Sequence, residues 1–154
     1  MNYFDLFQIP FSYRLDEPLL TQNYLQKQRE THPDLSNMRA SQMRSALLNE
    51  AYNTLLDPIR RAKYFLYMQK PEAEDEISPE YASEAFDIRE RYDSITSLKE
   101  KEKYKEELSA RMSELITSLC AVEKNIDEFQ KIFSLLNFIA SFIEEIKADA
   151  YNRD

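Results

Sequence analysis

Apolar residues recur at steps of three and four along most of the chain, and this spacing predicts helices. Asp16 can cap the first long helix, with Glu17 and Pro18 in its first turn, where a missing backbone N–H costs nothing. We expect this helix to end near Thr31, because the residue that precedes Pro33 is disfavoured in the α conformation.

A second helix is predicted from Met38 to Leu56. Its apolar residues are four and three apart, so they are expected to share one packing face: Met43, Leu47, Leu48, Tyr52 and Leu55. Asp57 and Pro58 then predict the start of a further helix, which carries Ala62, Tyr64, Phe65 and Leu66. Two antiparallel helices are therefore joined by a polar connection.

The second half of the chain predicts three more helices, and Ser78-Pro79-Glu80 is a strong start signal for the first of them. The three expected apolar seams are Tyr81/Ala85/Ile88/Tyr92/Ile95, Tyr104/Leu108/Met112/Leu115/Leu119/Val122/Ile126, and Phe129/Ile132/Phe133/Leu136/Ile139/Ala140/Ile143/Ile146. Three seams fit a three-helix bundle. The last helix has a second apolar line, Leu135/Phe138/Phe142, which indicates either the central helix of the bundle or a patch that faces a partner.

An acidic, proline-containing stretch without apolar spacing separates the two halves. We therefore expect a first domain at 1–70, a linker at 71–77 and a second domain at 78–154. Residues 1–70 carry 9 Lys and Arg against 7 Asp and Glu, a net charge of +2, whereas residues 71–154 carry 11 against 21, a net charge of −10. The acidic half disfavours a nucleic-acid partner.

The composition excludes several kinds of site. The chain of 154 residues contains no glycine, which argues against phosphate-binding loops and dinucleotide-binding fingerprints. Cys120 and His32 are the only residues of their types, so we expect no zinc or iron–sulfur centre and no other cofactor. No apolar run is long enough to span a membrane, and no signal or transit peptide is recognisable, so a bacterial-type cytoplasmic location is expected. We also expect a monomer.

The tripeptide His32-Pro33-Asp34 is the strongest candidate for function. Proline restricts the backbone, while histidine and aspartate offer a donor and an acceptor to a partner. An enzymatic interpretation, with His32 as a general base oriented by Asp34, lacks a nucleophile or a substrate pocket, so no catalytic residue is predicted. As a bare tripeptide it is also typical of an ordinary turn.

The context of this tripeptide resembles a J-domain, in which His-Pro-Asp lies between two antiparallel helices. Two parts of the sequence resemble the HscB family, the J-proteins of iron–sulfur cluster assembly. They are the opening residues Met1 to Phe7 (MNYFDLF) and a later set that consists of Asn49, Ala51-Tyr52, Thr54-Leu55, Pro58, Arg61-Ala62 and Tyr64. This resemblance implies an all-α fold with an N-terminal J-domain helical hairpin and a C-terminal three-helix bundle. It covers the whole chain, strongly over 1–68 and mainly in architecture beyond.

The resemblance also implies two binding sites. A DnaK-type (HscA-like) chaperone would contact His32, Pro33 and Asp34, together with the preceding helix at Tyr24, Lys27 and Arg29. An IscU-like scaffold would contact the first helix of the bundle, where Phe86, Asp87 and Glu90 match the family's positions. Phe86 falls off the predicted packing seam, so it is either this contact or a single exposed aromatic residue.

The resemblance therefore implies a co-chaperone that stimulates the chaperone's ATPase and delivers the scaffold to it, and that is not itself an enzyme. The alternative is a J-like adaptor or assembly protein without ATPase coupling.

Overall fold

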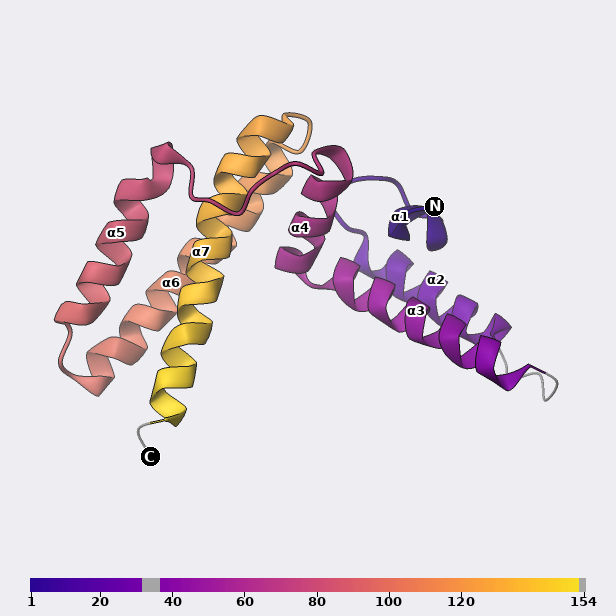
Figure 1. Ribbon diagram of the computed structural model, residues 1–154, viewed down its shortest axis with the longest axis horizontal. Helices are drawn as coiled ribbons and strands as arrows, with labels where there is room; N and C mark the ends of the chain where they lie inside the picture. Colours follow the sequence, from indigo (N-terminus) through magenta and orange to yellow (C-terminus); the bar gives the residue numbers. More distant parts are fainter. Residues whose placement is uncertain (32–36, 153–154) are drawn as a thin grey trace. The chain divides into compact units, whose positions relative to one another are not determined.

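The computed structural model describes residues 1–31 and 37–152, and within them the chain is helical, with no strand (Figure 1). The helices are α1 (Tyr3–Leu6), α2 (Glu17–Glu30), α3 (Met38–Leu56), α4 (Pro58–Gln69), α5 (Pro79–Ser94), α6 (Leu98–Ala121) and α7 (Ile126–Tyr151). Their contacts form two compact units, Met1–Phe65 and Leu66–Asp154. The boundary between the units falls inside α4, and the predicted domain limits of 1–70 and 78–154 remain a prediction.

The predicted helix starts are confirmed by hydrogen bonds at the caps. Asp16 Oδ1 accepts the backbone N–H of Leu19 at 3.1 Å at the start of α2. Asp57 Oδ1 accepts the N–H groups of Ile59 and Arg60, both at 2.9 Å, at the start of α4. These bonds satisfy donors that have no partner within the helix, which is why the two aspartates fix both helix starts.

In the first unit, α2 and α3 pack as an antiparallel hairpin and α1 packs against α3. Fully buried aromatic and aliphatic side chains form the core at the base of the hairpin: Phe4, Phe7, Tyr13, Leu20 and Leu55. After α1 the chain turns at Gln8, whose φ of 54° is in the left-handed region. The N–H groups of Gln8 and Ile9 donate to the carbonyls of Asp5 and Phe4, both at 3.0 Å, which ends the helix in a Schellman turn without glycine.

The predicted packing face of α3 is wrong at two positions. Met43 and Leu47 are 67% and 51% exposed, although Leu48 and Leu55 are buried as expected. The buried residues of α3 all lie at or after Leu48, in the half of the helix that the base of the unit covers. The first half of α3 extends beyond the core at the base of the unit, so equal apolar spacing does not lead to equal burial.

Arg61 joins α4 to the rest of the first unit from a buried position, with 7% of its surface exposed. Its Nε donates to the carbonyl of Tyr13 at 2.9 Å and its Nη1 to the carbonyl of Leu55 at 2.7 Å. The guanidinium carbon also lies 4.9 Å from the centroid of the Tyr13 ring. One side chain therefore connects the segment before α2, the end of α3 and α4.

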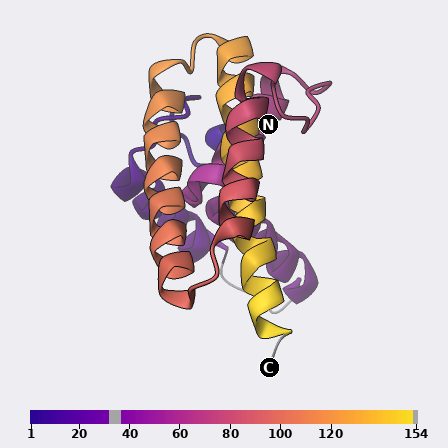
Figure 2. The same ribbon diagram turned by 90° about the vertical axis from the view of Figure 1, so that its left-hand side faces the viewer.

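In the second unit α7 is the central helix, since it packs against both α5 and α6 (Figure 2). Leu135 and Phe142 of the second apolar line are buried and Phe138 is half-buried, so this line serves the core of the bundle rather than a separate patch. Ile126, which we assigned to the seam of α6, begins α7 instead, because Asn125 Oδ1 accepts the N–H of Glu128 at 3.2 Å and caps a new helix there.

The predicted linker is tied to the second unit. Tyr67 Oη donates to Asp75 Oδ1 at 2.5 Å, and this hydrogen bond, with a smaller contribution from burial, raises the pKa of Tyr67 to about 12. Lys70 Nζ donates to Gln130 at 2.7 Å and forms an ion pair with Asp127 at 3.2 Å. The linker is therefore held against α4 by Asp75, while Lys70, at the residue after α4, contacts α7.

Candidate functional site

The tripeptide His32-Pro33-Asp34 lies outside the described residues, between the end of α2 at Glu30 and the start of α3 at Met38. The last described residue before it is Thr31. Its Oγ1 donates to the carbonyl of Lys27 at 2.7 Å and satisfies one of the last carbonyls of α2. The structure thus fixes the two helix ends that flank the candidate site.

Tyr24, predicted to contact the chaperone, lies between the helices of the hairpin. Its ring stacks on Tyr52 with centroids 4.1 Å apart, and its hydroxyl donates to Asn49 of α3. Gln28 Nε2 donates to the same Asn49 oxygen at 2.9 Å, while Ser45 Oγ donates to Gln28 at 3.1 Å. Together with the hydrogen bond between the hydroxyls of Thr21 and Tyr52 at 3.1 Å, these contacts form a polar ladder between α2 and α3.

Lys27 and Arg29, the two basic residues predicted to contact the same partner, are not brought together. Two residues on an α-helix are separated by about 200° around its axis. Lys27 is half-buried on the α3 side of α2, whereas Arg29 is exposed on the other side. They therefore offer positive charge to two different directions near the end of α2.

The predicted scaffold contact lies on the outer face of α5. Phe86 is 65% exposed, and Asp87 and Glu90 are exposed beside it. Neither carboxylate forms an ion pair with another described residue. Their neighbours Glu84 and Arg89 instead pair with residues of α6 and α7: Glu84 forms a bidentate pair with Arg111 at 2.9 Å, and Arg89 pairs with Glu145 at 3.3 Å. The outer face therefore presents an aromatic ring and two available carboxylates.

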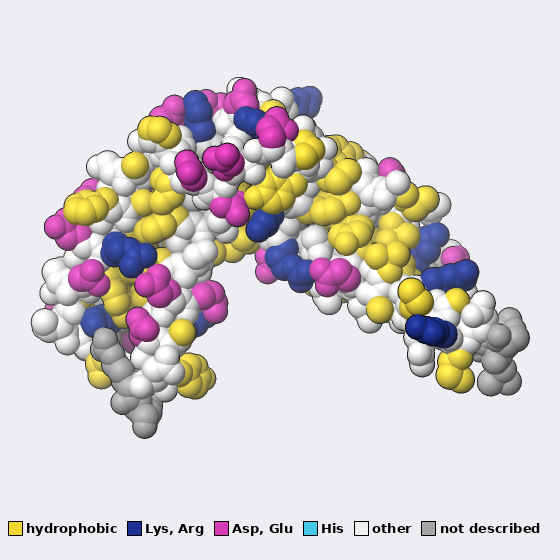
Figure 3. Space-filling view, viewed as in Figure 1, with side chains coloured by type: hydrophobic (Ala, Val, Ile, Leu, Met, Phe, Trp, Pro, Cys, Tyr) yellow, Lys and Arg dark blue, Asp and Glu magenta, His cyan; other side chains and the backbone are white. Residues whose placement is uncertain are grey.

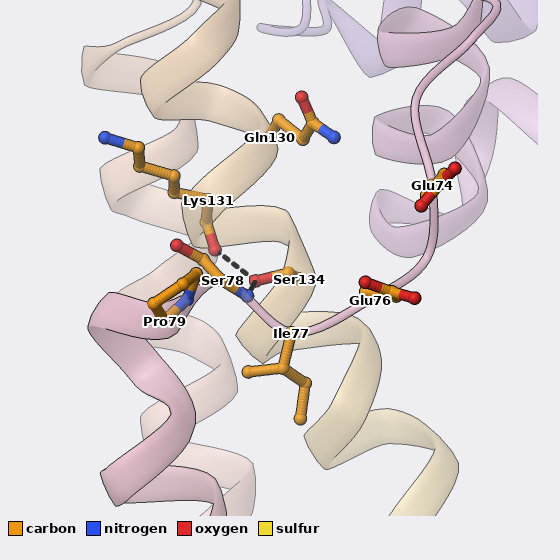
Figure 4. A pocket seen from close by; sticks show the side chains of 8 residues that line it. All are labelled: Glu74, Glu76, Ile77, Ser78, Pro79, Gln130, Lys131 and Ser134. Atoms are coloured by element: carbon orange, nitrogen blue, oxygen red, sulfur yellow. Dashed lines mark hydrogen bonds between the residues drawn. The ribbon is translucent and has the colours of Figure 1, made fainter.

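A hollow of about 270 Å³ lies beside the start of α5, between the linker and α7 (Figure 4). Ser134 Oγ accepts the N–H of Ser78 at 3.0 Å and donates to the carbonyl of Lys131 at 2.6 Å. Lys131 Nζ pairs with Glu80 at 2.9 Å and Glu128 at 3.2 Å. This hollow is explained by the attachment of the linker to α7.

The part of the chain that the structure describes offers neither a cluster of metal ligands nor a membrane-spanning helix. It contains no cluster of three or more His, Cys, Asp or Glu side chains that could hold a metal ion. None of its helices has the length and apolar character that crossing a bilayer requires.

Comparisons with known proteins agree on one family. No family model matches the chain. A co-chaperone protein HscB homolog from Vibrio cholerae is 36% identical over 107 residues, 63% of each chain, so that alignment spans less than two thirds of the relative. The HscB homolog of Shewanella baltica is 31% identical over 169 aligned positions that cover 95% of each chain. The chain belongs to the HscB family of co-chaperones.

Solved HscB structures have the same fold. The crystal structure of human co-chaperone protein HscB matches with a TM-score of 0.82 and 25% identity, over 97% of this chain and 82% of that one. Chaperone HscB from Vibrio cholerae matches with a TM-score of 0.75 and 26% identity over the full length of both chains. The J-domain hairpin and the C-terminal bundle predicted from the resemblance are thus confirmed as the fold.

The residues that carried the HscB resemblance mostly stabilise the fold. Tyr3 stacks on Tyr64 with centroids 4.5 Å apart, and the Tyr64 hydroxyl accepts the N–H of Tyr3 at 2.9 Å. Burial raises the pKa of Tyr64. Asn49 belongs to the polar ladder and Arg61 links three segments, as described above. The sequence motif therefore identifies the family mainly through packing. Of its candidate binding residues, Phe86, Asp87, Glu90 and Arg29 are exposed, Tyr24 and Lys27 are half-buried, and the tripeptide lies outside the described residues.

Proposed function

We propose that this HscB-family chain stimulates ATP hydrolysis by a DnaK-type (HscA-like) chaperone and delivers an IscU-like scaffold to it during iron–sulfur cluster assembly. The single observation that carries the proposal is similarity to a co-chaperone HscB homolog over 95% of both chains. The sequence His32-Pro33-Asp34 between the two helices of the hairpin supports it. The relatives are named co-chaperones, which supports a regulatory protein without catalysis of its own.

The two tasks are assigned to different surfaces. The tripeptide, with the end of α2, would contact the chaperone. The outer face of α5 would hold the scaffold, because Phe86 offers an apolar anchor and Asp87 and Glu90 offer carboxylates to a basic or polar rim on the partner. An exposed aromatic side chain beside unpaired charges is a common centre of a protein interface.

The chaperone contact is tested by steady-state ATPase of a purified HscA-like chaperone with wild-type protein and with His32→Gln. The wild type should accelerate turnover, and the variant should lose this acceleration while its circular dichroism stays helical. Acceleration by both proteins alike would remove the tripeptide from the mechanism. A wild type that binds chaperone and scaffold but leaves turnover unchanged would favour the adaptor without ATPase coupling.

The scaffold contact is tested by calorimetric titration of an IscU-like protein into the double variant Phe86→Ala/Glu90→Ala. We expect the affinity to fall by a factor of 30 or so, since truncating an interface anchor costs about 2 kcal/mol. The matched control is Leu98→Ala/Glu106→Ala, which removes an exposed apolar and an exposed acidic side chain from α6. Equal affinities for the two variants would exclude the outer face of α5.

A further inference from the structure

The helix that carries the proposed scaffold contact, α5, is held in the bundle by little apolar surface. Ala85 and Ile88 are its buried residues, whereas α6 and α7 each bury a larger set. Apolar contact has no preferred direction, so a narrow buried strip sets the rotation of a helix about its axis only weakly. The direction of Phe86, which is exposed on this helix, must therefore depend on other contacts.

Polar side chains bridge the seam between α5 and α6. The two backbones approach each other closely at few points, while α7 packs against both helices. Glu84 accepts two hydrogen bonds from Arg111 of α6, from Nε to Oε2 and from Nη2 to Oε1, both at 2.9 Å. The side chains of Arg111 and Glu84 are 34% and 37% exposed, so water and salt screen this pair less than an ion pair on the surface. A bidentate pair fixes the direction of the carboxylate as well as its distance.

A second ion pair holds the other edge of α5. Arg89 pairs with Glu145 of α7 at 3.3 Å. Glu84 and Arg89 are five residues apart, which separates them by about 140° around the helix axis, with the buried strip between them. Phe86 lies about 200° from Glu84, on the side away from the core. Charged side chains of both signs lie next to one another over the visible face of the bundle (Figure 3). Ion pairs on both edges therefore oppose rotation of α5.

A further ion pair of the seam with α6 lies nearer the end of α5. Arg91 pairs with Glu107 at 3.2 Å, and both side chains are more exposed than those of the Glu84 pair. Glu84 precedes Phe86 by two residues and Asp87 by three, and side chains three apart are neighbours on a helix surface. The Glu84 pair is therefore the contact with α6 best placed to hold the scaffold-binding face.

We propose that Arg111 is a positioning residue for the scaffold contact: by binding Glu84 it sets the rotation of α5, and with it the direction of Phe86, Asp87 and Glu90. The inference rests on the proposed function and adds a residue that acts through α5 from the neighbouring helix. Without this pair, α5 remains attached to α7 along one edge, and its outer face samples several directions. Affinity then falls with the fraction of molecules whose α5 is in place.

The test measures the affinity of a purified IscU-like scaffold by calorimetric titration for Arg111→Glu and for the charge-swapped Glu84→Arg/Arg111→Glu. The single reversal places two carboxylates together and should raise Kd about tenfold, through the lowered fraction of competent molecules. The double variant restores an arginine–carboxylate pair across the same seam and should recover most of the affinity. The matched control is Lys105→Glu, the same charge reversal in a pair with Glu102 within α6, which should change Kd by about twofold or less.

Hydrogen exchange separates a positioning role from a general loss of stability. In Arg111→Glu the amides of α5 should exchange faster while those of α6 and α7 keep their protection, and the double variant should restore the slow exchange of α5. The inference is overturned if Arg111→Glu binds the scaffold like the control, if exchange rises throughout the bundle, or if the double variant binds no better than the single one. A wild type that does not bind the scaffold refutes the proposed function itself, so the two failures are distinguished.

Discussion

Replacement of Arg61 by alanine should destabilise the first unit more than any exposed substitution on the same helix. The side chain is buried and donates two charged hydrogen bonds, to the carbonyls of Tyr13 and Leu55. Leu55 is in the last turn of α3, where carbonyls have no partner within the helix. Alanine would leave both carbonyls without this donor in a dry environment.

The magnitude follows from these contacts. Each buried carbonyl that loses its donor costs about 1–3 kcal/mol, and loss of the contact with the Tyr13 ring adds about 0.5–1 kcal/mol. For the two carbonyls and the ring together, we therefore expect Arg61→Ala to lower the free energy of unfolding by about 2.5–7 kcal/mol. Arg61→Lys should lose about half as much, because an ammonium keeps the charge but cannot reach both carbonyls with the fork of a guanidinium.

The neighbouring Arg60 provides the control. Its side chain is 47% exposed and pairs with Glu50 at 2.7 Å, so Arg60→Ala should cost only about 0.5 kcal/mol. Unfolding in urea is followed by hydrogen exchange at the amides of α3, which reports on the first unit alone. If Arg60→Ala and Arg61→Ala lower the free energy of unfolding equally, the buried hydrogen bonds from Arg61 to the two carbonyls do not explain its contribution to stability.

Three further predictions concern the turn after α1, the linker and the boundary between the units. Gln8→Gly should raise the free energy of unfolding by about 0.5–1 kcal/mol, whereas Gln8→Ala should not, because only glycine adopts the φ of 54° without strain; thermal melts compare the two. Asp75→Asn should move the pKa of Tyr67 from about 12 toward 10 in a spectrophotometric titration. In the wild type, the stability contributed by the Tyr67–Asp75 hydrogen bond should be complete below pH 10 and lost as the pH rises through about 12. A fragment of residues 66–154 should melt at a higher temperature than one of residues 78–154, because Lys70 contacts α7 only in the longer fragment; equal melting temperatures would show that the linker contacts add nothing.

The sequence predicts the local structure well, because caps act over a few residues. Asp16 and Asp57 each bind N–H groups within three positions, so their effect is readable without the fold. The second apolar line of α7 allowed either a central helix or a patch that faces a partner, and the burial of Leu135 and Phe142 shows the first to be right.

The remaining features depend on which segments meet in space. Met43 and Leu47 belong to the same apolar pattern as Leu48 and Leu55. The two pairs differ only in how far the core at the base of the hairpin extends along α3. Lys27 and Arg29 appear as one basic cluster in the sequence, although a helix directs them to different sides. No sequence signal pairs Arg61 with Tyr13, because the two residues are 48 positions apart.

The polar ladder between α2 and α3 has a consequence for the register of the hairpin. Apolar seams tolerate sliding, because one leucine replaces another at the next turn. Here Thr21, Tyr24 and Gln28 each need one particular partner on α3, and a shift by one turn, about 5.4 Å, would break these bonds together. These hydrogen bonds therefore fix the register of α2 against α3. By fixing the register, they also fix the separation of Thr31 and Asn37, the residues on either side of the His-Pro-Asp segment.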